Sequence, residues 1–264
     1  MKPAEELKVG LGNFLARYKA VRAEAAHRPA LALKNFMLRY RAVQAIAGRA
    51  EERIERLTAS RFSVFHYVWP DELALSRIIA DLLDPRGRHG QGQLFLRLFL
   101  NAFNRKMALA PPPGNQPFES AALAETIVVT EAATSHLDNT QRRIDILLVN
   151  PHWGLAIENK PWAGEQERQL ADYQAQLARK YPDRPRALLY LSGDGSPPAT
   201  ADSGYAAPVV MGYHGGHGLF LNAWLAEARD SCQVDKVRHF LADLTGWVEN
   251  NFKPASGEGE TRAA

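Results

Sequence analysis

The spacing of apolar positions divides the chain into a helical N-terminal part and a part that mixes helices with strands. Apolar residues at helical spacing predict one helix over 5–25 and a second over 31–58, joined near Pro29. The same spacing predicts a helix that starts at the N-cap Asp71 and another over 93–106. Alternating or continuous runs of large apolar residues between turn residues predict strands at 126–131, 143–149, 155–160, 186–192 and 208–213, and helical spacing predicts helices at 165–181, 219–229 and 234–252.

The order of these elements defines an α/β chain, more narrowly α+β, with a mixed central sheet. We expect a helical extension over 1–60, a folded domain over 61–254 and a polar, disordered tail over 255–264. The two N-terminal helices either pack on the domain or form a dimer arm, a substrate clamp or a docking surface. We expect no internal repeat.

Composition narrows the class of protein. The chain has 264 residues, of which 46% are hydrophobic, and can therefore bury a full core. A single cysteine, Cys232, excludes an internal disulfide framework and fits a reducing compartment. Acidic Glu5 and Glu6 and the lack of an apolar h-region argue against a signal peptide. No run reaches the roughly 20 apolar residues of a membrane span, so we expect a cytoplasmic protein without a membrane partner. A pI of about 9.0 is too mildly basic to indicate nucleic-acid binding by itself.

Two carboxylates and one ammonium group occupy one face of the hairpin predicted in the middle of the chain. Alternation places Glu158 and Lys160 on the same face, and a turn after Pro151 sets Asp145 opposite Glu158. Opposed Cβ atoms are roughly 5 Å apart, and two carboxylates at that distance repel by about 3 kcal/mol at an effective dielectric of about 20. A shared proton, the Lys160 ammonium or a divalent cation would offset this repulsion. The alternative is an exposed face whose acids point to solvent.

The spacing Asp145-x12-Glu158-x-Lys160 resembles the signature of the PD-(D/E)xK nuclease superfamily. The stretch from Glu72 to Gly92 is similar to the N-terminal helix and loop of one branch of that superfamily. Gln169-Leu170 with Tyr173 is similar to its helix after the lysine. The resemblance implies a restriction-endonuclease-like αβββαβ core. Two positions depart from the pattern: Ile144 replaces the usual proline, and Asn159 stands where an apolar residue is common, so its side chain must find polar partners on the opposite face.

The resemblance also implies a reaction and a set of site residues. Asp145 and Glu158 are expected to hold Mg²⁺, for which Mn²⁺ substitutes, and Lys160 to assist the attacking water or to stabilise the phosphoryl group. Glu72 either reaches this site or only interacts with its own helix dipole. Two further predictions come from position alone. Gln169, at i and i+4 with Tyr173 on one helix face, is expected to direct polar atoms at the site, and Glu131 to add a carboxylate, because neighbouring strand ends converge at one edge of a sheet. The expected function is a metal-dependent nuclease acting on DNA, in defence against foreign DNA. The alternative is a non-catalytic nucleic-acid- or protein-binding module on the same scaffold.

Basic residues near the predicted site suggest how a nucleic acid is held. Arg86 and Arg88 flank a glycine loop that contains His89, and Arg142 and Arg143 directly precede Asp145. These side chains are expected to contact phosphates, which would make binding sensitive to salt. For His89 the alternative is simple polar surface. The expected partners are DNA and either a second copy of the chain or a defence-system protein bound through the N-terminal helices.

Overall fold

The computed structural model describes residues 3–59, 62–109, 117–134, 142–162, 168–199, 206–216 and 219–254, with backbone alone at 3–7 and 26–30. The chain separates into two compact units, Met1–Phe62 and Ser63–Ala264. The expected tail at 255–264 lies outside the described residues. None of the helices in the described part of the chain has both the length and the hydrophobicity that crossing a membrane requires.

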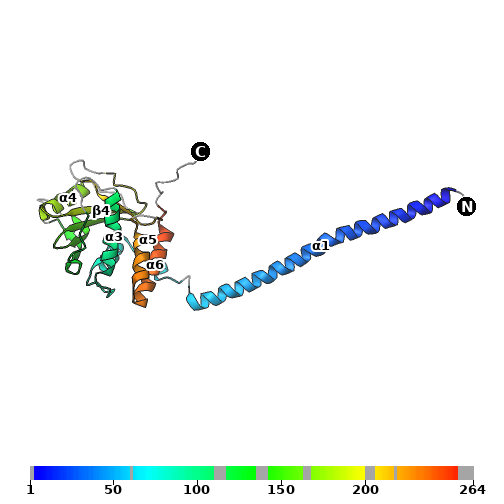
Figure 1. Cartoon of the computed structure of the whole chain (residues 1–264), viewed down its shortest axis with the longest axis horizontal. Coiled ribbons are helices and arrows are strands. Elements are labelled where there is room, and N and C mark those ends of the chain that lie inside the picture. Colours follow the sequence, from blue (N-terminus) through cyan, green and yellow to red (C-terminus); the bar gives the residue numbers. More distant parts are fainter. Residues whose placement is uncertain are drawn as a thin grey trace. The chain divides into compact units, whose positions relative to one another are not determined.

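The N-terminal unit is one continuous helix, α1 (Pro3–Thr58), which Figure 1 shows as a single long rod. The prediction of a helical pair joined near Pro29 was therefore wrong. A proline inside a helix costs about 3 kcal/mol, but the flanking sequence is rich in Ala, Leu, Arg and Glu, the residues that favour helix most. Local propensity on both sides thus carries the helix through Pro29.

The prediction that the chain has no internal repeat was also wrong. Asn13–Ala25 recurs as Asn35–Ala47, and eight of the thirteen positions are identical (Asn, Phe, Arg, Tyr, Ala, Val, Ala and Ala). The Phe and Tyr of each copy stack on one another, with ring centroids 6.5 Å apart in the first copy and 6.3 Å in the second. At a rise of about 1.5 Å per residue, α1 presents the same exposed aromatic pair twice, about 33 Å apart.

The second unit is built on one five-stranded sheet with the order β1-β2-β3-β4-β5. The first three strands pair antiparallel, and β3, β4 and β5 pair parallel, so the sheet is mixed as predicted. The strands are β1 (Ile127–Ala133), β2 (Arg143–Val149), β3 (Gly154–Lys160), β4 (Arg186–Ser192) and β5 (Val209–Gly212).

Helices cover the two faces of this sheet unequally. One face packs on a large apolar core that includes residues of α2, α3, α5 and α6, while α4 covers the other face with a smaller core around Tyr173 and Leu177. Figure 1 shows α5 and α6 side by side, with α3 next to them. The helices are α2 (Glu72–Leu83), α3 (Leu94–Leu109), α4 (Gln169–Lys180), α5 (Leu221–Ser231) and α6 (Asp235–Asn251), with short 3-10 turns at Val64–His66 and Leu123–Glu125.

The α2-βββ-α4-β4 order matches the restriction-endonuclease-like core. The start of α2 also agrees with its prediction, because Asp71 Oδ1 accepts a hydrogen bond of 2.8 Å from the backbone N–H of Ala74. The only cysteine, Cys232, is buried and forms no disulfide.

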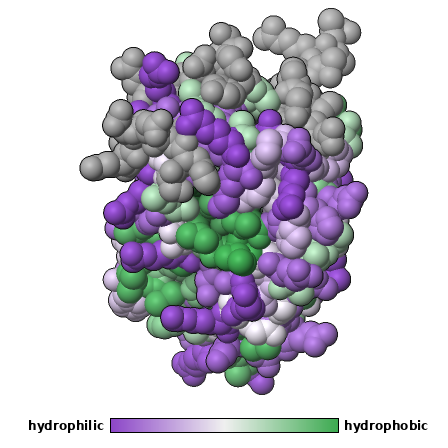
Figure 2. All heavy atoms as spheres, turned by 90° about the vertical axis from the view of Figure 1, so that its left-hand side faces the viewer, coloured by the Kyte–Doolittle hydropathy of each residue, from purple (hydrophilic) through white to green (hydrophobic). Residues whose placement is uncertain are grey.

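Hydrophobic side chains are not confined to the interior. Figure 2 shows one face of the molecule, on which hydrophobic side chains gather within a rim of hydrophilic ones. In the Ser63–Ala264 unit, the exposed large residues include Ile127 and Val129 on β1, and Trp69 and Trp162 elsewhere. Contiguous exposed apolar side chains often mark binding surfaces.

Candidate active site

The two acids predicted to oppose each other are brought together by the β2–β3 hairpin. Its register pairs Ile146 with Ile157, so position 145 falls opposite position 158, as expected. Regular pairing between the strands stops at Ile146, however. Beyond that point Asp145 Oδ2 accepts a hydrogen bond of 2.7 Å from the backbone N–H of Asn159. The strands therefore separate at the acids, which leaves room between them.

Glu158 is the most deeply buried charged residue of the group. Its side chain is 1% exposed, and Lys160 Nζ lies 2.8 Å from its Oε1. This contact is a close ion pair, and the Asp145 carboxylate also interacts with the Glu158 side chain. Two acids buried side by side cost free energy unless a shared proton, Lys160 or a further positive group compensates them.

Lys160 lies between two carboxylates that come from different elements. Its Nζ is 2.8 Å from Glu158 Oε1 and 2.8 Å from Glu72 Oε1 on the first turn of α2. The prediction that Glu72 reaches the site is therefore supported by a direct contact, in addition to its favourable place at the helix N-terminus. Asp145, Glu158, Lys160 and Glu72 form what we call the acid–lysine cluster.

Burial and mutual repulsion shift the pKa values of this cluster. Removal from water raises the pKa of Glu158 to about 8, the negative charge of Asp145 adds to the rise, and Lys160 opposes it. Burial also raises the pKa of Asp145, against the hydrogen bond from the Asn159 backbone. Burial alone would lower the pKa of Lys160, but attraction to Glu158 outweighs it, so the net shift is upward. Lys160 is therefore a permanent cation.

Asn159, the departure from the family pattern, holds the cluster to its surroundings. Its buried side chain donates from Nδ2 to Ser76 Oγ at 3.0 Å and to the Glu72 carbonyl at 3.3 Å. It also accepts a 2.7 Å hydrogen bond from the hydroxyl of Tyr213. The amide thus fixes α2, which carries Glu72, against β3, which carries Lys160. Tyr213 carries no signal of this role in the sequence, because nothing near it marks a contact with residue 159.

We expect Asn159→Ala to lower the free energy of unfolding by about 2–4 kcal/mol, because the Tyr213 hydroxyl and Ser76 then lose a buried partner. Tyr213→Phe removes one of the partners and should cost only about 1 kcal/mol. Urea denaturation of both variants measures the difference. Equal losses in the two variants would contradict this role for the amide.

Glu131 was predicted to add a carboxylate to the site, but the structure places it outside the acid–lysine cluster. Its carboxylate pairs with Arg143 at the edge of the sheet, with 3.7 Å between Oε2 and Nη1, and both side chains are exposed. Its backbone is left-handed, with φ of +52°, which breaks the regular course of β1. In the described part of the chain, no three Asp, Glu, His or Cys side chains are placed to share one metal ion.

Gln169 is linked to the start of β2 through Tyr173. Its Nε2 donates to the hydroxyl of Tyr173 at 2.9 Å, and that hydroxyl donates to the backbone carbonyl of Arg143. The ring of Tyr173 is fully buried in the smaller core. This chain of hydrogen bonds ties α4 to the start of β2, two residues before Asp145.

The basic residues expected to hold phosphates have different surroundings. Arg143 is 65% exposed, next to β1, and Arg86 is 62% exposed, although its Nη2 donates to the Thr126 carbonyl. Arg142 forms a 2.7 Å ion pair with Asp172 on α4. Its positive charge is therefore largely neutralised within the protein. Arg88 lines a hollow between α2 and α6.

His89 is part of the loop structure. It is 5% exposed, its Nε2 lies 3.0 Å from the Asp84 carbonyl, and its Nδ1 accepts from the backbone N–H of Gln91 at 3.0 Å. Both ring nitrogens are therefore engaged, and the ring packs on Phe95. The His89 ring therefore offers no free nitrogen to a nucleic acid.

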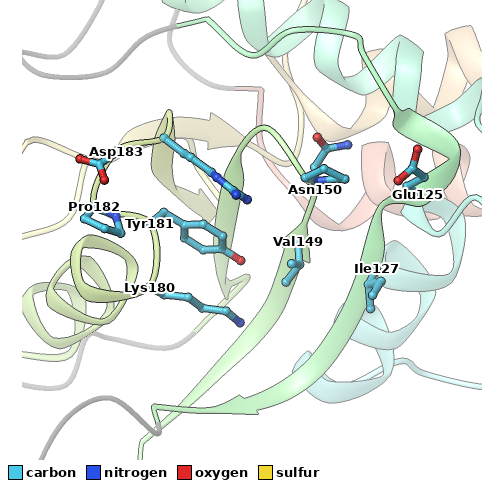
Figure 3. Close-up of a pocket in the computed structure, with 10 residues that line it drawn as sticks. Glu125, Ile127, Val149, Asn150, Lys180, Tyr181, Pro182 and Asp183 are labelled. Atoms are coloured by element: carbon cyan, nitrogen blue, oxygen red, sulfur yellow. The ribbon is translucent and has the colours of Figure 1, made fainter.

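A separate hollow of about 470 Å³ lies at the other end of β2, and Figure 3 shows the side chains around it. Val149 and Asn150 line one side, and Lys180, Tyr181 and Pro182 line the other. At about 3.3 Å per strand residue, Asn150 lies roughly 16 Å from Asp145. No member of the acid–lysine cluster lines this hollow, so it is distinct from the candidate active site.

Comparison with known families agrees with this geometry. The model of one family, described as PD-(D/E)XK nuclease superfamily, matches residues 62–246, well over half of the chain. The chain therefore belongs to the PD-(D/E)XK nuclease superfamily. No curated protein and no solved structure gives a significant match.

The acid–lysine cluster fits a divalent cation, the cofactor that nucleases of this superfamily generally use. Glu158 is buried beside the Asp145 carboxylate, whose negative charge contributes to the raised pKa of Glu158. A cation held by both acids would compensate this repulsion. Two protein carboxylates suit Mg²⁺, which usually binds one or two such groups and keeps several waters.

We expect the metal-free protein to lose stability as pH rises between about 4.5 and 8. Glu158 has a pKa near 4.5 when unfolded and about 8 when folded, so across this range the folded state holds the extra proton. One proton gives a slope of at most about 1.4 kcal/mol per pH unit. Urea denaturation in EDTA at several pH values tests this. A stability that is flat or rises with pH, or a slope that is no shallower in Glu158→Gln than in the wild type, would contradict it.

Proposed function

We propose that this protein is a Mg²⁺-dependent nuclease that hydrolyses phosphodiester bonds in DNA. The observation that carries the proposal is the burial of Glu158 beside the Asp145 carboxylate, with Lys160 Nζ 2.8 Å from Glu158 Oε1. An acid set of this kind is unfavourable in a purely structural or binding role. A role in defence against foreign DNA belongs to the same proposal, and its support is the family resemblance alone.

Each residue of the acid–lysine cluster has its own part in the proposed reaction. Asp145 and Glu158 would hold the Mg²⁺, which when bound neutralises phosphate charge and lowers the pKa of a coordinated water. Lys160, whose pKa is raised, keeps its proton at neutral pH and so serves as a fixed donor that stabilises charge on the phosphoryl group. Glu72 holds the Lys160 ammonium in place and is a positioning residue. Arg86 and Arg143, both largely exposed, are the proposed contacts to flanking phosphates.

Purified full-length protein, incubated with plasmid, linear duplex, single-stranded DNA or RNA, tests the proposal. We expect cleavage of DNA with Mg²⁺ or Mn²⁺ and no cleavage with EDTA. Binding without metal-dependent cleavage of any of these substrates would overturn the proposal in favour of a binding module. Cleavage of RNA alone would overturn the choice of DNA.

A further inference from the structure

Two exposed tryptophans lie beside the acid–lysine cluster. Trp69 stands three residues before Glu72, and Trp162 follows Lys160 by two residues. The two residues are 64% and 50% exposed. The two indoles stack on each other with centroids 6.5 Å apart and planes 27° apart. We call them the tryptophan pair.

Two buried aromatic residues pack against the tryptophan pair on the side of the protein interior. Trp247, 5% exposed, meets Trp69 edge-on at 5.5 Å and Trp162 edge-on at 6.3 Å. Phe252, 6% exposed, stacks on Trp162 at 5.6 Å. The pair is therefore held in a defined orientation although its outer surface meets water. Exposing two large rings has a cost in solvation that a bound apolar group would recover.

Trp162 of the tryptophan pair borders a cleft that also reaches Lys160. The cleft has a volume of about 380 Å³, and both Lys160 and Trp162 line it. Tyr190 and Phe252 add aromatic surface, while Asp194 and Lys253 add groups that recognise polar atoms. A molecule in this cleft thus touches aromatic rings and Lys160 at the same time.

A nucleobase of the substrate strand has the chemistry that this cleft accepts. Its flat face stacks on an indole, its edge offers donors and acceptors, and its attached phosphate carries the negative charge that Lys160 and Lys253 attract. Inside a duplex both faces of a base are covered by its neighbours. Only an unpaired and unstacked base can use the indole.

We propose that the tryptophan pair and its cleft form a binding subsite for an unpaired nucleobase next to the bond that is cut. This rests on the proposed nuclease function and specifies its substrate class as single-stranded nucleic acid, or duplex with unpaired nucleotides at the cleavage position. Trp69 and Trp162 are then specificity residues, distinct from the acid–lysine cluster that performs the chemistry.

The test compares binding of single-stranded dT20 and rU20 with binding of a DNA duplex by the full-length protein in EDTA, where cleavage is absent. We expect both single strands to quench tryptophan fluorescence and to bind tighter than the duplex. Trp162→Ala and Trp69→Ala should each weaken single-strand binding by about 5- to 100-fold and leave duplex binding unchanged. Trp162→Tyr keeps a stacking face and should restore most of the affinity. Leu109→Ala, at an exposed residue of α3, is the matched control.

Equal affinity for single strand and duplex, or single-strand binding unaffected by either alanine variant, would overturn the subsite. Circular dichroism of each variant separates loss of binding from loss of folding, and Trp162→Tyr serves as the second variant if Trp162→Ala does not fold. Failure of the nuclease proposal gives a different result. If single strands bind through the tryptophans but are not cleaved in Mg²⁺, the subsite proposal holds and the nuclease proposal fails. If both alanine variants still cleave intact duplex, the nuclease proposal holds and the subsite proposal fails.

Discussion

Lys160→Ala is expected to lower the rate of metal-dependent cleavage by about 10²–10³-fold, the loss typical of removing one preorganised charge stabiliser. The physical reason is that Lys160 keeps its proton through its attraction to Glu158 and is held by Glu72. Alanine removes the positive charge but leaves both carboxylates. The affinity for the metal should therefore persist while catalysis falls.

Single-turnover cleavage rates under saturating Mg²⁺ measure this effect, with circular dichroism and thermal melting to show that the variant folds. Lys180→Ala is the matched control, because Lys180 lies over the ring of Tyr181, at the hollow away from the cluster. Retention of more than about a tenth of the wild-type rate by Lys160→Ala would show that this ammonium is not part of the chemistry.

Glu158→Gln is expected to move activity and stability in opposite directions. Activity should fall more than the roughly 100-fold that marks loss of an outer-shell metal partner, because Glu158 is a proposed direct ligand. Metal-free stability at pH 8.5 should rise by about 1 kcal/mol, or a Tm increase of about 2–4 °C, because a buried charge is replaced by a neutral group of the same shape. The amide can also donate to Asp145.

Thermal melting at pH 8.5, with EDTA and then with Mg²⁺, measures both parts. Wild-type protein should gain stability from the metal, whereas Glu158→Gln should start higher and gain little. Glu249→Gln on α6 controls for the loss of one negative charge. A Glu158→Gln protein that is less stable than wild type in EDTA at this pH would show that the buried carboxylate stabilises the fold.

The repeated segment of α1 shows a limit of reading the sequence by periodicity. Helical spacing of apolar residues correctly predicted helix on both sides of Pro29. The proline led to the incorrect prediction of two helices in place of one. Periodicity depends only on whether each position is apolar or polar, so it does not reveal that residue identities recur 22 positions apart, from Asn13 to Asn35.

The sequence by itself determined the strands, the hairpin register and the place of Asp145, Glu158 and Lys160 on it. These features follow from a side-chain period of two and from local turn chemistry, which depend only on neighbouring residues. The cap at Asp71 followed for the same reason.

Only the tertiary structure decided which other residues join the site. Glu72 reaches Lys160 across 88 positions of sequence, whereas Glu131, on the neighbouring strand, turns to Arg143 at the sheet edge. The separation of β2 from β3 at the acids and the pairing of Trp69 with Trp162 are likewise products of packing. The physical reason is that long-range contacts depend on how helices lie on the sheet, and no local period specifies the distance between residues that meet in this way.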